Sequence, residues 1–350
     1  MNNTPQPKKR IEYLDALRGF TMILVVINHI ACCCLGVNTV EDGTYHYYLQ
    51  QFRMPLFFFV SGFVLYKKDF IWNFTNSLKF LNKKVPVQII SPLIFLLLYI
   101  YIHEITFSSA SVDTTKSGYW FTFTLFEFFL IYILLQNLFL VTKLNRSKIG
   151  STLLLLTALV LSFSHKIPEI LPYDNLWGLI GITNFRYFLF FVLGTFVRKH
   201  FNKFEYLLDN TPIILVCVTF YFISNILSDL VPFFQGKDFI NTKLLAICGI
   251  VIIFSLFRKY GDVFTKDTAF AKTLKFIGRR TLDIYLLHYF FIPRNLSKVL
   301  PIFTDNNIPL IEFAVSLLLA ALAIGACLCI SCILRLSPTM AHYLFGAKKE

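Results

Sequence analysis

Long apolar runs separated by short charged loops constrain this chain more than any other feature. A helix needs about 20 mostly apolar residues to cross the hydrocarbon core of a bilayer. The composition supports such helices, because 56% of the residues are hydrophobic and only 15% are charged, whereas about 25% are charged in a typical soluble chain. The sequence therefore predicts an all-α, polytopic membrane bundle that forms one domain over residues 1–350. The ten expected spans are 14–36, 46–66, 86–105, 119–141, 151–165, 176–197, 211–229, 240–257, 275–292 and 308–335.

Lysine and arginine are distributed unevenly between the loops. Most of the 33 basic residues fall in alternate loops and near the two ends of the chain. Basic residues in short loops stay on the cytoplasmic side of a membrane. This asymmetry predicts an even number of spans with both termini in the cytosol, and cytosolic tails over residues 1–13 and 336–350. It also accounts for the net charge of +13 without a nucleic-acid partner.

The eight cysteines form no recognisable metal site or disulfide framework. Six of them lie in or near apolar runs, and no zinc-like spacing pairs them with histidines. We therefore expect them to be packing residues, and we expect no metal ion.

Two ionisable residues stand near opposite ends of the first span. The stretch "LDALRGFTMILVVINHI" (14–30) carries Arg18 and, eleven residues further on, His29. A charged side chain at bilayer depth costs several kcal/mol unless it has a partner or faces water. Eleven residues of α-helix correspond to about three turns and about 16 Å. The two side chains are therefore expected on one face of the helix, at different depths.

Ionisable residues recur in four other spans, in the middle or outer part of the bilayer. Arg53 lies in "FRMPLFFFVSGF" (52–63), Glu127 in the fourth span, Arg186 in the sixth and His288 in the ninth. With His29, these residues place five ionisable groups at similar depth on five helices. Five such groups predict one central polar cavity rather than five unrelated ionisable residues in the membrane.

Each of these residues also has a structural interpretation. A histidine within a span can be a buried group whose hydrogen bonds are satisfied. Arg53 could reach the interface, Glu127 could neutralise an arginine, and Arg18 could be a cytosolic anchor. Asp283, in the ninth span, could join a hydrogen bond between packed helices. Ser61, followed by a glycine, suits close helix approach.

Several strings in this order resemble the integral-membrane acyltransferase-3 family: "YLDALRG" followed by a histidine, "RMPLFFFVSGF", "YWFTFTLFEFF", "RYFLFFVLG" and "IYLLH". The resemblance covers essentially the whole chain. It implies a multi-pass protein of the bacterial inner (plasma) membrane. Such a protein transfers an acyl group, most often acetyl from cytosolic acetyl-CoA, to a hydroxyl of an envelope carbohydrate or lipid-linked glycan. Two departures stand out: the chain carries no soluble esterase-like domain, and Glu127 stands alone where some members have Ser-x-x-Glu.

By the same resemblance, Arg18 and His29 are the paired functional motif and Arg53 is the arginine of the second span. Residue chemistry suggests the remaining roles. An imidazole suits a general base near neutral pH, or a nucleophile that forms an acyl-histidine, and an arginine stabilises an oxyanion. The expected catalytic residues are His29, Arg53, Glu127, Arg186 and His288; the residues expected to bind the donor's phosphates are Arg18, Lys83, Lys84, Arg279 and Arg280.

Two other functions are open to such a sequence. A polytopic transporter of a glycan precursor or small anion would also place charges at the bilayer midplane. The chain has no internal repeat, which argues against that class. A non-catalytic assembly partner is the third possibility, and it would not require His29.

Overall fold

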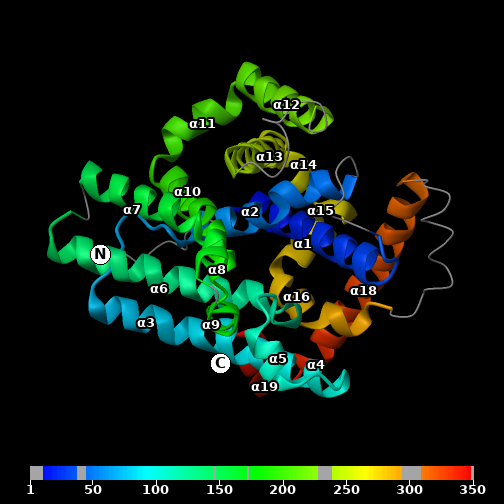
Figure 1. Cartoon of the computed structure of the whole chain (residues 1–350). Helices are drawn as coiled ribbons and strands as arrows, with labels where there is room; N and C mark the ends of the chain where they lie inside the picture. The colour runs from blue at the N-terminus through cyan, green and yellow to red at the C-terminus, as the bar shows by residue number, and fades with distance from the viewer. Residues whose placement is uncertain are drawn as a thin grey trace, which may run out of the picture.

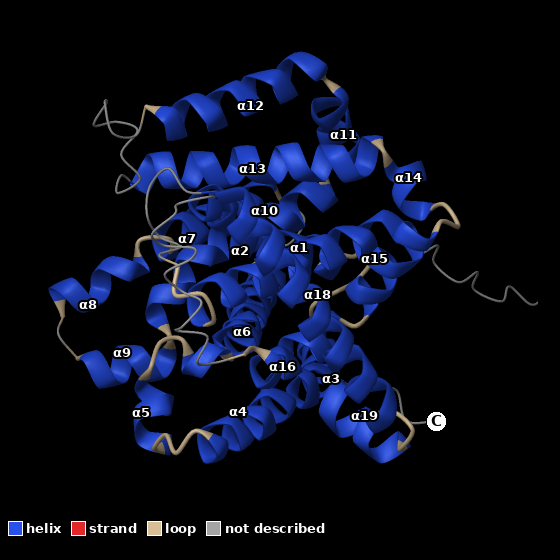
Figure 2. Ribbon diagram, turned by 90° about the vertical axis from the view of Figure 1, so that its right-hand side faces the viewer, coloured by secondary structure: helices blue, strands red, loops and turns tan. Residues whose placement is uncertain are grey.

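The computed structural model describes residues 11–37, 45–144, 147–171, 173–227, 239–293 and 309–347, and within them every regular element is helical (Figures 1 and 2). The α-helices are α1 (Glu12–Cys33), α2 (Tyr45–Leu65), α3 (Phe74–Val85), α4 (Ser91–Ile102), α5 (Phe107–Val112), α6 (Trp120–Val141), α7 (Lys148–Leu161), α8 (Ile167–Ile170), α9 (Asp174–Ile180), α10 (Phe188–Lys199), α11 (Phe201–Asp209), α12 (Thr211–Ile226), α13 (Phe239–Lys259), α14 (Gly261–Thr265), α15 (Ala269–Arg279), α16 (Thr281–Phe291), α18 (Pro309–Leu334) and α19 (Pro338–Phe345). The shorter turns that matter below are η1 (Pro86–Ile90), η2 (Lys116–Gly118) and η4 (Ile182–Tyr187).

Each of the ten apolar runs contains helix, but only some helices are long and apolar enough to cross a membrane unaided. Within the described residues, five segments meet that condition. A sixth is added if α11 and α12, which are bent by 72° relative to each other, count as one span. The five segments are Glu12–Cys33, Phe74–Ile102, Trp120–Val141, Lys148–Ile170 and Leu310–Leu334.

Three expected spans have a different local structure. The third begins earlier, at Phe74, because α3 continues through the π-helical turn η1 into α4 without a break. The sixth is divided into α9, η4 and α10, since Gly181 adopts a left-handed conformation with φ of 65°. The ninth is divided between α15 and α16 at Arg280.

Helix α1 lies at the centre of the molecule. It contacts α2, α13, α14, α15, α16 and α18, and the two views show it enclosed by these neighbours (Figures 1 and 2). Helices α12 and α13 lie side by side along one edge. Large apolar side chains such as Leu97 of α4 and Leu318 of α18 remain exposed, as expected of surfaces that face lipid tails.

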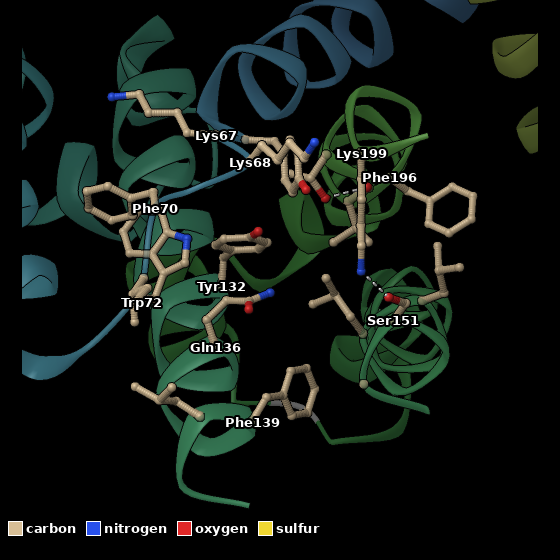
Figure 3. A pocket seen from close by; sticks show the side chains of 18 of the residues that line it. Lys67, Lys68, Phe70, Trp72, Tyr132, Gln136, Phe139, Ser151, Phe196 and Lys199 are labelled. Carbon is tan, nitrogen blue, oxygen red and sulfur yellow. Dashed lines mark hydrogen bonds between the residues drawn. The ribbon is translucent and has the colours of Figure 1, made fainter. Parts of the chain in front are cut away.

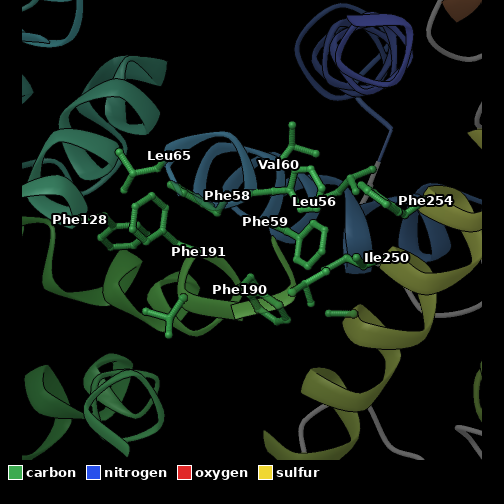
Figure 4. Packing of buried hydrophobic residues seen from close by; sticks show 14 of the residues in the cluster. Leu56, Phe58, Phe59, Val60, Leu65, Phe128, Phe190, Phe191, Ile250 and Phe254 are labelled. Carbon is green, nitrogen blue, oxygen red and sulfur yellow. The ribbon is translucent and has the colours of Figure 1, made fainter. Parts of the chain in front are cut away.

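Phenylalanine fills much of the core between α2, α6, α10 and α13. Phe58, Phe128 and Phe191 are all buried, and the rings of Phe58 and Phe128 lie 4.9 Å apart (Figure 4). Helices α2 and α10 approach closely through two glycines. A Cβ atom on Gly62 would lie 1.9 Å from the carbonyl oxygen of Phe191, and one on Gly194 would lie 2.0 Å from that of Phe59. Only a residue without a side chain fits at either position.

Part of the segment expected as a C-terminal cytosolic tail is helical. Helix α19 packs against η1 and α4, with Ala341 and Phe345 buried. Ser91 donates a hydrogen bond to the carbonyl oxygen of Tyr343 at 2.8 Å, which joins the two segments.

Asp283 joins α16 to the C-terminal end of α18. Asp283 is only 1% exposed, and its carboxylate accepts hydrogen bonds from Nε and Nη2 of Arg335, both at 2.8 Å, and one from the hydroxyl of Ser331. Arg280 lies 3.4 Å away on the same side. The helix-packing interpretation of Asp283 is therefore confirmed.

Replacing Asp283 with alanine should destabilise the protein strongly, because removing one partner of a buried ion pair leaves the other charge uncompensated. Such losses amount to about 3–5 kcal/mol of the free energy of unfolding. The thermal unfolding midpoint of the protein in detergent measures the effect. Asp267→Ala is the control, since it removes the exposed pair with Lys272. Equal midpoints for the two variants would contradict the assignment.

Candidate active site

Two imidazoles face each other where α1 packs on α16. The Nδ1 atom of His29 lies 2.9 Å from Nε2 of His288, and the two rings are nearly parallel, with centroids 5.1 Å apart. The hydroxyl of Tyr289 lies 3.3 Å from the other ring nitrogen of His29. His288 is fully buried, whereas His29 is partly exposed. We call His29 and His288 the histidine pair.

The backbone determines which nitrogens of the histidine pair carry protons. Nδ1 of His288 lies 3.0 Å from the carbonyl oxygen of Ile284 and 2.8 Å from that of Tyr285. A carbonyl oxygen can only accept, so Nδ1 of His288 carries the hydrogen and the neutral ring's Nε2 is an acceptor. His29 must then donate to it from Nδ1. The lone pair of His29 is left on Nε2, where it can accept the hydrogen of the Tyr289 hydroxyl at 3.3 Å. A ring nitrogen with a lone pair is what a general base requires.

A cavity of about 240 Å³ runs along one face of α1. Arg18, Met22, Val25 and His29 all line it, at intervals of three and four residues that keep side chains on one helical face. The expected shared face of Arg18 and His29 is therefore present. The cavity extends from a basic end at Arg18 to His29, between α1, α2, α6 and α16; His288 lies behind His29 and does not line it.

Arg53 of α2 lines the same cavity as His29. The residue is 8% exposed, and its Nε atom has no hydrogen-bond partner among the described residues. No ion pair of Arg53 occurs within that part of the chain either. A buried guanidinium without a counter-ion retains its capacity to stabilise a negative charge that develops beside it.

The structure does not bring Glu127 or Arg186 to this cavity. Glu127 of α6 does not line it, and its buried Oε2 atom has no hydrogen-bond partner in the described part of the chain. Arg186 of η4 is exposed and lies over Tyr187, with its Nη2 atom 3.2 Å from the tyrosine hydroxyl. Tyr187 stacks on Trp120, whose ring lines the cavity. Two aromatic rings therefore separate Arg186 from the interior.

Of the five residues expected to bind the donor's phosphates, three line the cavities and two do not. Arg18 and Lys84 line both the 240 Å³ cavity and an adjoining one of about 570 Å³, and Lys83 lines the adjoining cavity. Arg279 and Arg280 line neither. Arg279 donates to the carbonyl oxygen of Lys275, and Arg280 is directed to Asp283.

Gln88 is a cavity residue that sequence reasoning missed. It lies in the π-helical turn η1, lines both cavities, and its buried Oε1 atom has no partner among the described residues. Pro86 lacks a backbone N–H and thereby favours such a widened turn, and π-turns are frequent at functional sites. Two prolines within one apolar run were the available signal.

A strained loop forms the wall of the cavity beside Tyr289. Lys116, Ser117 and Gly118 all have positive φ, between 47° and 102°. Asp113 holds this loop by accepting hydrogen bonds from the backbone N–H groups of Thr115 and Ser117, both at 2.9 Å. A Cβ atom on Gly118 would lie 2.2 Å from the ring of Tyr289. Glycine is therefore required at position 118, where the loop contacts the ring of Tyr289.

Replacing Asp113 with alanine should lower the thermal unfolding midpoint in a pH-dependent way. Burial alone would raise the pKa of Asp113, but the hydrogen bonds from Thr115 and Ser117 outweigh burial and lower it. A lowered pKa contributes stability at neutral pH, and this contribution is lost as the pH falls through that pKa. The difference in midpoint between the variant and the unchanged chain should therefore narrow between about pH 6 and about pH 3. A difference that stays constant with pH would contradict this role.

Comparison with known proteins identifies the family. No curated protein and no solved structure matches the chain. The model of the acyltransferase-3 family, described as an acyltransferase domain, matches residues 11–336. That range contains both histidines and all the cavity-lining residues of α1, α2, η1, α6 and α16. The chain therefore belongs to the acyltransferase-3 family and is an integral membrane acyltransferase.

Proposed function

We propose that this acyltransferase moves an acetyl group from cytosolic acetyl-CoA to a hydroxyl of an envelope carbohydrate. The observation that carries the proposal is the cavity that joins the basic end at Arg18 to His29 along one face of α1. A donor that enters from one end and an acceptor that approaches the other would meet at the histidine pair. We further propose ten spans, with both termini in the cytosol of a bacterial cell and the chain in its inner membrane.

The distribution of charge supports this direction of entry. Arg18, Lys83 and Lys84 converge at the end of the cavities that adjoins the basic loops, and basic loops stay in the cytosol. Acetyl-CoA is an anion with a long, narrow arm. Its phosphates suit these cations through charge-assisted hydrogen bonds, while its arm suits the mixed lining of Met22, Val25 and neighbouring side chains.

The transfer itself follows from the proton arrangement of the histidine pair. Nε2 of His29 takes the proton of the acceptor hydroxyl as the acceptor oxygen bonds to the thioester carbon. The carbonyl oxygen becomes an oxyanion, which Arg53 stabilises; such contacts are worth on the order of 3–4 kcal/mol. The carbon–sulfur bond then breaks, and the leaving thiolate takes the proton from His29. The same lone pair would serve as the nucleophile if an acyl-histidine forms first.

His29→Ala should abolish transfer without loss of folded protein, because the variant removes the base from a cavity wall. General-base catalysis contributes roughly 10²–10⁴-fold. Acetylated product is measured by mass spectrometry with the purified protein in vesicles, and thermal unfolding monitors folding. His200→Ala, which changes a histidine outside the cavities, is the control. Normal transfer by His29→Ala would overturn the proposed function, and a transporter would then be the better explanation.

Variants of His288 test whether it positions His29. His288→Leu removes the acceptor that keeps the hydrogen on Nδ1 of His29, so we expect a loss of roughly 10²-fold or more in kcat with little change in KM. His288→Gln should restore part of the rate, since its amide oxygen can accept the same hydrogen. The pH dependence of kcat should also shift in both variants. Equal rates for the leucine and glutamine variants, with an unchanged pH profile, would indicate a packing role only.

A further inference from the structure

A third cavity, of about 440 Å³, lies where several helices end together. Its wall combines the loop that follows α2, the C-terminal ends of α6 and α10, and the N-terminal end of α7 (Figure 3). Cavities of this size accommodate small organic ligands. The proposed transfer at the histidine pair makes no use of it.

The lining of this cavity combines cations with aromatic rings. Lys67, Lys68 and Lys199 line it, and Lys199 donates a 2.7 Å hydrogen bond to the hydroxyl of Ser151 (Figure 3). Among the described residues in the wall, Asp69 alone is acidic. The indole of Trp72 lies in the same wall. Phosphate oxygens pair with lysines, and a planar base stacks on an aromatic ring.

Two features hold the Trp72 ring in position. It packs edge-on against Tyr132, with centroids 5.8 Å apart, and against Phe80 at 5.2 Å. Its indole is therefore fixed by α3 and α6 before any ligand arrives, which lowers the entropic cost of stacking.

The three cavities form a row in which each adjoins the next. Lys67 and Trp72 line both the 440 Å³ and the 570 Å³ cavities. Arg18, Lys84 and Gln88 line both the 570 Å³ cavity and the 240 Å³ cavity that contains His29. A long ligand with an anionic, planar end could therefore extend from the lysines to the histidine pair.

We propose that the 440 Å³ cavity binds the 3′-phosphorylated adenine nucleotide end of the acyl-CoA donor. Lys68 and Lys199 contact the ribose phosphate, Lys67 contacts the diphosphate at the boundary between cavities, and Trp72 stacks on the adenine. This assignment rests on the proposed function. Arg18, Lys83 and Lys84 of the adjoining cavity keep the diphosphate together with Lys67, while the ribose phosphate and the adenine pass to the 440 Å³ cavity instead of to Arg279 and Arg280.

The test compares CoA with dephospho-CoA, which lacks only the ribose phosphate. Binding to the full chain in phosphatidylcholine nanodiscs is measured by calorimetry. The unchanged chain should prefer CoA, and the double variant Lys68→Ala/Lys199→Ala should bind CoA about tenfold more weakly, which corresponds to about 1.4 kcal/mol, while dephospho-CoA binding changes little. Lys148→Ala is the matched control, because this exposed lysine of α7 does not line the cavity. Trp72→Ala should weaken both ligands, with recovery in Trp72→Phe.

The outcomes separate this assignment from the proposed function. If the double variant binds CoA as tightly as the unchanged chain does, the cavity assignment is overturned but the proposed function is not. Failure of the unchanged chain to bind or consume acetyl-CoA would overturn the proposed function as well. Lipid phosphate has the same chemistry, so the titration is repeated in nanodiscs that contain phosphatidylglycerol. If phosphatidylglycerol stabilises the unchanged chain but not the double variant, and CoA does not compete with this effect, the cavity binds a lipid headgroup. That result would also overturn the assignment.

Discussion

The hydrogen bond between His29 and His288 is the interaction on which the proposed transfer depends. It connects the most central helix to α16, and its direction is imposed by the backbone rather than by the imidazoles themselves. The carbonyl oxygens of Ile284 and Tyr285 fix the hydrogen on one ring. His288 then accepts the hydrogen of His29, so an ordinary turn of helix determines which nitrogen of His29 keeps its lone pair.

The hydrogen bond between the two histidines requires that α1 and α16 keep their relative positions. Contacts of α16 with its neighbours hold it in place. The carboxylate of Asp283, two residues before Tyr285 and five before His288, joins α16 to α18. The hydroxyl of Tyr285 donates to the carbonyl oxygen of Gly118 at 3.1 Å, which connects α16 to the strained loop before α6. Polar contacts with unambiguous donors thus flank the contact between His29 and His288, whose donor follows from the tautomer of His288.

The sequence predicts the helical face on which a site residue lies, but not the direction of every side chain. The face shared by Arg18 and His29 depends only on the helical repeat, and it was predicted correctly. Depth in the bilayer could be estimated for Glu127 and Arg186, but depth does not specify the direction in which a side chain points. The left-handed turn at Gly181 begins the short helix η4, from which Arg186 lies outside over Tyr187. Gln88 carries no charge, and only its place in a π-turn brings it to the cavity.

Arg53 has a consequence for the membrane as well as for the reaction. A fixed positive charge inside a narrow, partly apolar passage repels hydronium and sodium ions. In the proposed function a donor reaches the outer part of the bilayer from the cytosol, and its passage must not let ions leak down the electrochemical gradient. The guanidinium of Arg53, which lines the cavity with His29, would repel such cations without a moving gate. The group proposed to stabilise an oxyanion would then also limit the leak of protons across the membrane.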